Sequence, residues 1–144
     1  MKSQKTQTCI CVEKIKIMTD KLLFFVDDEP MFINLMEYTF LGKSGYTVKT
    51  FGSGTECLES MYLNPDLVVV DFFLNTADSM TGMDLVKKIK EAHPATLLVF
   101  LSGNDDAAVI EEAKALGVEQ YILKDGYFID NLIECVTRLI PPAY

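Results

Sequence analysis

The stretch Leu67–Asp71, with the sequence Leu-Val-Val-Val-Asp, decides the fold of this chain. Its aliphatic residues follow one another without a polar break, after the turn-forming pair Asn64-Pro65. Such a run, unlike an alternating one, is typical of a strand covered on both faces, as in the middle of a parallel sheet. Ligands of open α/β sheets bind outside the carboxyl ends of the strands. The acid that ends the run, Asp71, is therefore the first candidate functional residue.

On both sides of this stretch in the sequence, apolar runs alternate with segments whose apolar residues recur at helical spacing. The expected strands are residues 22–26, 46–51, 67–71, 96–101 and 119–123, and the expected helices are about 30–41, 54–62, 82–92, 105–116 and 127–140. This alternation predicts an α/β fold, a doubly wound five-stranded parallel sheet with right-handed crossovers and the order 2-1-3-4-5. Neither a dinucleotide-binding glycine motif nor a Walker motif follows the first strand.

Composition and net charge limit the kinds of molecule that we expect to bind this chain. The 144 residues suggest one domain, and 13 basic against 21 acidic side chains give a net charge of -8. This charge opposes nonspecific attraction to nucleic acid or to an anionic membrane, so we expect neither as a partner; it favours a divalent cation or a basic protein patch. The sequence shows neither a signal peptide nor an apolar run of membrane-spanning length, and a cytoplasmic protein with free thiols is expected.

The chain divides into three parts by pattern. Residues 1–20 form an N-terminal extension, interpreted as flexible, although an extra strand or a docking helix is compatible with its apolar positions. Residues 21–140 form the domain, and residues 141–144 form a short tail. No second, output domain is expected in this chain.

The ends of the predicted strands carry an unusual set of polar residues. Asp27 and Asp28 follow the first strand, Asp71 ends the third, Ser102 follows the fourth and Lys124 follows the fifth. In the order 2-1-3-4-5 the strand order reverses between strands one and three, so these side chains are expected to converge on one crevice.

Three converging carboxylates need a proton or a cation. Two carboxylates 4 Å apart repel by about 4 kcal/mol at an effective dielectric constant of 20. A set of oxygen ligands without histidine or cysteine suits Mg2+, which combines one or two carboxylates with water and phosphate oxygens. A phosphoryl group on Asp71 would complete such a shell, with Ser102 donating to one phosphoryl oxygen and Lys124 neutralising another.

This set resembles the receiver domain of two-component response regulators, the CheY-like variant of the flavodoxin-like fold. The similarity covers roughly residues 21–140. The matching motifs are Val26-Asp27-Asp28, Asp71, Leu101-Ser102-Gly103 and Tyr121-Ile122-Leu123-Lys124. Singly these motifs are weak, but together and in this order they are specific.

The resemblance implies a phosphorelay function. Asp71 would be the phosphoacceptor, taking a phosphoryl group from a phosphohistidine of a sensor histidine kinase or a histidine phosphotransfer protein. Asp28, Asp71 and the backbone carbonyl of Phe73 would hold Mg2+, with Asp27 assisting through water. The protein would catalyse only its own phosphorylation and dephosphorylation and would not be an enzyme in the usual sense.

The resemblance also implies a switch. Ser102 would move toward the phosphoryl group, Lys124 would bind it, and Tyr121 would then turn inward. The change would reach the surface around the fourth helix, fifth strand and fifth helix and alter binding to a downstream protein that the sequence does not identify. The sequence leaves open whether phosphorylation drives homodimerisation.

Several positions depart from the family pattern. Asp125 follows Lys124 where the family usually has proline, and the usual proline soon after the phosphoacceptor is absent. The segment 72–82 is about three residues longer than is typical, which we expect to alter access to Asp71 or to offer a partner surface. Phe73 and Asn104 occupy positions that tune phosphoryl hydrolysis in the family.

Other interpretations stay open at this point. Asp27 and Asp28 could cap the first helix, Ser102 and Lys124 could be ordinary surface residues, and Tyr121 could serve packing alone. A pseudo-receiver would keep the fold but act as an interaction module with little phosphorylation. A Mg2+-dependent phosphatase of the haloacid-dehalogenase class also uses an aspartyl nucleophile, but it needs a second aspartate at the position of Phe73.

Overall fold

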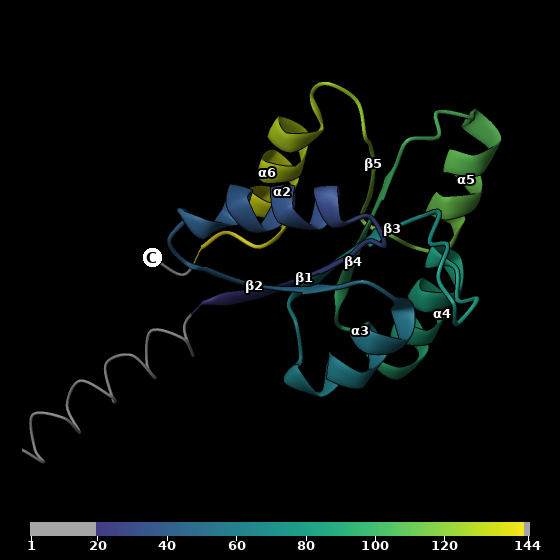
Figure 1. Cartoon of the computed structure of the whole chain (residues 1–144), viewed down its shortest axis with the longest axis horizontal. Coiled ribbons are helices and arrows are strands. Elements are labelled where there is room, and N and C mark those ends of the chain that lie inside the picture. Colours follow the sequence, from purple (N-terminus) through teal and green to yellow (C-terminus); the bar gives the residue numbers. More distant parts are fainter. Residues whose placement is uncertain (1–19, 143–144) are drawn as a thin grey trace, which may run out of the picture.

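A computed structural model describes residues 20–142 of the chain. Five parallel strands form one sheet in the order β2-β1-β3-β4-β5 (Figure 1). They are β1 (Lys21–Val26), β2 (Tyr46–Phe51), β3 (Leu67–Asp71), β4 (Leu97–Ser102) and β5 (Gln120–Leu123). The predicted fold class and strand order are confirmed. The interpretation of residues 1–19 and 143–144 lies outside the described residues.

Helices connect the strands and cover both faces of the sheet. They are α2 (Pro30–Leu41), α3 (Gly54–Ser60), the 3-10 helix η1 (Met61–Leu63), α4 (Gly82–Ala92), α5 (Ala107–Ala115) and α6 (Phe128–Leu139). The helix expected over residues 54–62 thus ends as a 3-10 turn, closed by Asn64 in the left-handed conformation (φ 55°). The other bounds either equal the expected ones or differ from them by one or two residues, which is normal at frayed helix and strand ends.

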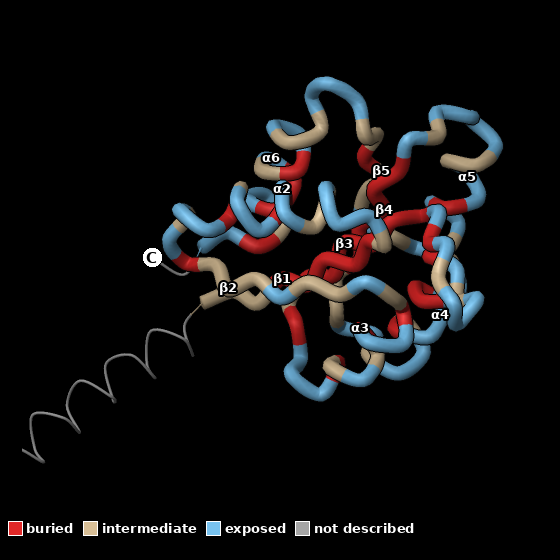
Figure 2. Tube along the Cα trace, viewed as in Figure 1, coloured by how far each residue is buried: buried red, intermediate tan, exposed pale blue. Residues whose placement is uncertain are grey.

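The uninterrupted apolar run of β3 is buried on both sides, as predicted. Val68 and Val70 face a core shared with α3, α4 and α5, whereas Leu67 and Val69 face a core shared with α2 and α6. Residues 67–71 are all buried (Figure 2). Side chains of successive strand residues point to opposite faces, so only a doubly covered strand can be apolar throughout.

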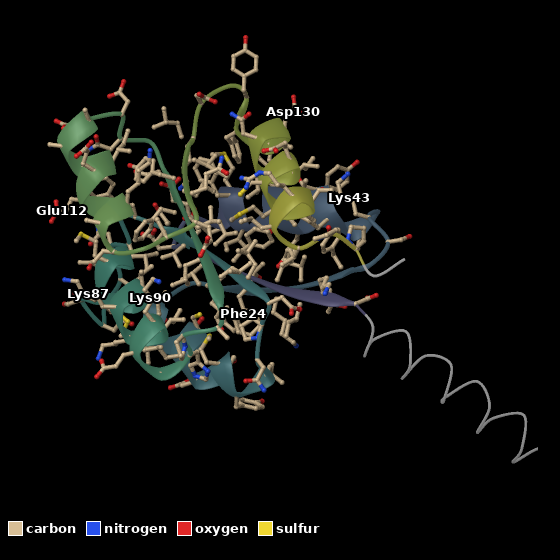
Figure 3. The ribbon with its side chains drawn as sticks, turned by 180° about the vertical axis from the view of Figure 1, so that it is seen from behind. Phe24, Lys43, Lys87, Lys90, Glu112 and Asp130 are labelled. Carbon is tan, nitrogen blue, oxygen red and sulfur yellow. The ribbon has the colours of Figure 1, made fainter. Side chains whose placement is uncertain are left out.

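The helices follow the same division between core and solvent. Leu85, Val86 and Ile89 of α4 are fully buried. Figure 3 shows Phe24 of β1 inside the molecule, whereas Lys87 of α4 and Glu112 of α5 lie at its periphery. The described cysteines, Cys57 and Cys135, are free and buried, and burial raises the pKa of Cys57 to about 12, as expected of unreactive packed thiols. Among residues 20–142, no helix combines the length and apolar character needed to cross a membrane.

Candidate functional site

The site lies at the carboxyl edge of the sheet, where β1 and β3 are neighbours. Asp71 ends β3 and pairs in register with Leu101 of β4, and Lys124 directly follows β5. Asp27 and Asp28 directly follow β1. Because all five strands are parallel, their carboxyl ends meet at one edge. The predicted convergence of the acids and the lysine is thus a consequence of the strand order.

Three carboxylates form a compact cluster of oxygen ligands. One oxygen from each of Asp27, Asp28 and Asp71 lies within 4.8 Å of the others. Asp27 and Asp71 are buried and Asp28 is half-buried. These hard oxygen donors, partly open to solvent, fit Mg2+ better than a metal that needs nitrogen or sulfur ligands. The cluster is the only such group within residues 20–142.

Lys124 is the counter-charge of this cluster. Its Nζ lies 2.7 Å from Asp27 Oδ2 and 3.5 Å from Asp71 Oδ2. The Lys124 side chain is only 8% exposed, so its charge is poorly screened by water. The backbone holds this position as well, because the Lys124 N–H donates to the carbonyl of Ser102 at 2.8 Å.

The surroundings of Asp71 disfavour the ionised form of its carboxyl group. Burial, and then repulsion by Asp27 and Asp28, raise its pKa, while Lys124 and the N–H of Phe73 lower it; the net effect is a rise from 3.8 to about 6. The Phe73 N–H donates to Asp71 Oδ1 at 3.2 Å. A cation added to the cluster would relieve this repulsion. The proposed role of the Phe73 carbonyl as a metal ligand stays a prediction.

Asp27, directly after β1, uses both of its carboxylate oxygens as acceptors. Its Oδ1 accepts from the N–H of Glu29 at 2.9 Å, and its Oδ2 accepts from Lys124. The residue at the N-cap of α2 is Glu29, which makes no side-chain capping hydrogen bond. Capping alone therefore does not account for this acid, whose second oxygen is bound by a lysine 97 residues away.

Ser102 and Asn104 form the turn beside the acids. Ser102 is fully buried, and its Oγ accepts from the N–H of Asn104 at 3.1 Å. The Asn104 side chain is itself engaged, accepting from the N–H of Asp106 at 2.8 Å. The structure thus places Ser102 on the strand next to that of Asp71, and its movement toward a phosphoryl group stays a prediction.

Tyr121 of β5 contacts the turn after β4 and two aromatic residues of the core. Its hydroxyl donates to the carbonyl of Asn104 at 2.8 Å, and its ring lies 6.1 Å from Phe72 and 6.4 Å from Phe100, between ring centroids. Tyr121 is half-buried against these two aromatic residues, and its hydroxyl connects it to the Ser102–Asn104 turn. This contact gives a physical path for a switch, and the switch itself stays a prediction.

Two departures from the family pattern have structural counterparts. Asp125 Oδ1 accepts from the N–H of Tyr127 at 2.8 Å, which makes a tight turn into α6 where the family usually has proline. The long segment after β3 is anchored to α3: Asp78 Oδ2 accepts from Thr55 Oγ1 at 2.6 Å and from Thr55 N at 3.2 Å. Asp78 Oδ1 also accepts from the N–H of Met80 at 3.0 Å.

Sequence reasoning missed two residues of this region. The first is Asp78, because nothing in the sequence relates it to Thr55. The second is Phe32, whose ring centroid lies 3.9 Å from Lys124 Nζ. Its helical spacing from Met36 and Phe40 indicates only a core position, but its place one turn after Asp28 is a signal that could have revealed it.

Comparisons with known proteins agree with this geometry. The family model described as response regulator receiver domain matches residues 23–136. The luminescence regulatory protein LuxO of Vibrio campbellii is 28% identical over 108 residues, which are 70% of this chain and 23% of LuxO. Regulator of RpoS of Escherichia coli is 28% identical over 124 residues, 85% of this chain and 36% of that protein. The chain spans about a quarter to a third of these curated relatives.

A solved structure shows the same fold. The chemotaxis response regulator CheY4 of Vibrio cholerae superposes with a TM-score of 0.74 at 22% sequence identity, covering 85% of this chain and all of that one. The resemblance inferred from the strand-end motifs is confirmed by the match to the family model. Since the family model covers well over half of the 144 residues, this protein belongs to the family of response regulator receiver domains.

Proposed function

We propose that this receiver domain accepts a phosphoryl group on Asp71 in a Mg2+-dependent reaction and thereby changes its binding to other proteins. The observation that carries the proposal is the clustering of Asp27, Asp28 and Asp71 within 4.8 Å beside the buried Lys124. A histidine kinase or histidine phosphotransfer protein would be the donor, and another protein would be the downstream target.

The carboxylate of Asp71 is the nucleophile. One of its oxygens forms a bond to phosphorus while the phosphorus–nitrogen bond of a phosphohistidine breaks, and the electron pair of the broken bond stays on the imidazole nitrogen. The product is an acyl phosphate. Asp71 attacks as the ionised carboxylate, and a pKa of about 6 leaves most of it ionised at neutral pH.

The neighbouring residues have distinct tasks. Asp28 and Asp71, assisted by Asp27, would hold Mg2+, which neutralises charge on the phosphoryl oxygens when bound. Lys124 lies where it can exchange part of its contact with Asp27 for a phosphoryl oxygen. Ser102 would offer its hydroxyl to another oxygen. The domain acts on its own aspartate and turns over no external substrate.

Phosphorylation adds a charge of about -1.5 to -2 beside an already acidic cluster. The hydrogen bonds that the Asn104 N–H donates to Ser102 Oγ and that the Tyr121 hydroxyl donates to the Asn104 carbonyl connect this charge to the turn that precedes α5. Movement there would alter the α5–β5–α6 surface, which we propose as the surface read by the target protein.

Mass spectrometry after incubation with Mg2+ and phosphoramidate tests the proposal. We expect the gain of one phosphoryl group, stable in acid and labile in base, that is lost in Asp71→Asn and retained in Asp105→Asn, a matched change of an exposed acid. No gain in the wild-type protein would indicate a pseudo-receiver. Sustained hydrolysis of phosphate esters would indicate a phosphatase.

A further inference from the structure

The ammonium group of Lys124 is enclosed on three sides. Asp27 Oδ2 lies 2.7 Å from Nζ and Asp71 Oδ2 lies 3.5 Å from it. On another side is the ring of Phe32, with its centroid 3.9 Å from Nζ. Because the Lys124 side chain is only 8% exposed, the aromatic ring takes much of the place that water would occupy around this cation.

Phe32 is held firmly in this position. It lies in the first turn of α2, where its N–H donates to the carbonyl of Glu29 at 3.1 Å. Its ring packs edge-to-face against Phe128, the first residue of α6, with centroids 5.7 Å apart and planes at 63°. Phe32 therefore contacts both the site lysine and the helix that follows it.

We propose that Phe32 is a positioning residue that holds the Lys124 ammonium at the carboxylates, an inference that rests on the proposed phosphorylation of Asp71. The negative face of an aromatic ring attracts a cation, most strongly where water is excluded. Unlike a carboxylate, the ring does not accept a proton from the ammonium, and it cannot take the place of a phosphoryl oxygen as the partner of Lys124. It therefore holds the lysine at the site but leaves it free to move from Asp27 to an incoming phosphoryl group.

Simple packing between α2 and α6 is the competing explanation. If Phe32 only filled space, an aliphatic side chain of similar volume would serve equally well, and loss of the Phe128 ring would have a comparable effect. If Phe32 acts on Lys124, the aromatic face itself is required. Three variants separate these cases: Phe32→Leu removes the face, Phe32→Tyr keeps it, and Phe128→Leu removes the neighbouring ring but leaves Phe32 in place.

The first measurement needs neither metal nor phosphate. With the Lys124 ammonium over the Phe32 ring, the ε-methylene protons of Lys124 lie in the ring current of Phe32. NMR of the unphosphorylated protein should therefore show these protons shifted upfield. We expect the upfield shift to be lost in Phe32→Leu and kept in Phe32→Tyr and Phe128→Leu. An unchanged shift in Phe32→Leu would overturn the proposal. Should that variant not fold, Phe32→Met replaces it.

The second measurement is the rate of phosphorylation by phosphoramidate with Mg2+. We expect Phe32→Leu to be slower by about tenfold, the factor that a desolvated cation–π contact can contribute. Phe32→Tyr should restore most of the rate, and Phe128→Leu should change it by less than about twofold. Equal slowing in Phe32→Leu and Phe128→Leu would support packing alone. Failure of the wild-type protein to accept phosphate, with the NMR shift intact, would contradict the proposed function but not the Lys124–Phe32 contact.

Discussion

Lys124 Nζ lies closer to Asp27 Oδ2, at 2.7 Å, than to Asp71 Oδ2, at 3.5 Å. The lysine therefore compensates the more deeply buried acid first, and Asp71 is left with incomplete neutralisation. This explains why burial and the charge of Asp27 outweigh Lys124 and raise the pKa of Asp71 to about 6. Two expectations, one on stability and one on metal affinity, depend on this incomplete neutralisation.

The first concerns stability and pH. An acid whose pKa is raised from 3.8 to about 6 binds its proton more tightly in the folded state, so the free energy of unfolding falls as pH rises between these values. The raised pKa of Asp71 lowers the free energy of unfolding by about 3 kcal/mol at pH 7.5 and by about half of that at pH 5. Asp71→Asn, which removes the charge, should stabilise the protein in urea unfolding, and more so at pH 7.5.

The exposed Asp105 provides the control for this effect. Asp105→Asn should leave the free energy of unfolding within about 0.5 kcal/mol of the wild-type value at both pH values. A stabilisation by Asp71→Asn of equal size at pH 5 and pH 7.5 would contradict the electrostatic explanation.

The second expectation concerns metal affinity. Mg2+ needs the ionised carboxylate, and with a pKa of about 6 only about one tenth of Asp71 is ionised at pH 5. The dissociation constant for Mg2+, measured by calorimetry, should therefore be about tenfold higher at pH 5 than at pH 7.5. Asp71→Asn should bind Mg2+ more weakly and lose most of this pH dependence. Equal wild-type affinity at both pH values would argue against Asp71 as a ligand.

The third expectation concerns how α4 packs on the site strand. A Cβ atom on Gly82 would overlap the backbone carbonyl oxygens of Asp71 and Phe72, neither of which is a flexible side-chain end. Gly82→Ala should lower the free energy of unfolding by about 3 kcal/mol, at the upper end of overpacking effects. Gly42→Ala is the matched control, because nothing lies within 4 Å of the added atom. Equal stability of the two variants would show that α4 shifts without cost.

The fold and the acidic cluster could be predicted because they depend on local pattern and on topology. The unbroken apolar run of β3 fixed the central strand, and parallel strands must bring Asp28, Asp71 and Lys124 to one edge. The contact between Phe32 and Lys124 depends instead on side-chain direction across two elements 92 residues apart in sequence. No periodicity reveals such a direction, since a core aromatic and a ring over a lysine have the same helical spacing.

The long segment after β3 shows the same limit. Its length and the absence of the usual proline were evident from the sequence, but its anchor was not. Asp78 is held by Thr55 of α3, 23 residues earlier, and by local bonds with Thr76 and Met80. These hydrogen bonds, led by that of the Thr55 side chain, lower the pKa of Asp78.

The fourth expectation follows from this anchor. Asp78→Ala removes the acceptor for Thr55 and Met80, so amide hydrogen exchange should become faster across residues 72–81 and at the first turn of α3. Exchange in β3 should not change, because its amides belong to the sheet. Asp105→Ala, at another exposed acid, should leave residues 72–81 as protected as in the wild type. Protection unchanged in Asp78→Ala would mean that the segment is held by other contacts.

The last expectation concerns the lifetime of the phosphoryl group. The Phe73 side chain is 53% exposed, its ring lies 4.8 Å from that of Phe72 between centroids, and its N–H bonds Asp71 Oδ1. Because the backbone of Phe73 is bonded to the phosphoacceptor carboxylate, we expect its exposed ring to hinder the approach of water. Phe73→Ala should lose phosphate on the order of fivefold faster, which corresponds to about 1 kcal/mol in the barrier.

A time course of phosphate release after removal of the phosphodonor measures this lifetime. Tyr62→Ala is the control, since Tyr62 is also an exposed aromatic, 74% accessible, but belongs to η1 and not to the site. Equal lifetimes in Phe73→Ala and the wild type would mean that the ring only packs against Phe72. A shorter lifetime in Phe73→Ala alone would show that a surface aromatic residue sets how long the signal persists, because the acids and Lys124 are the same in all three proteins.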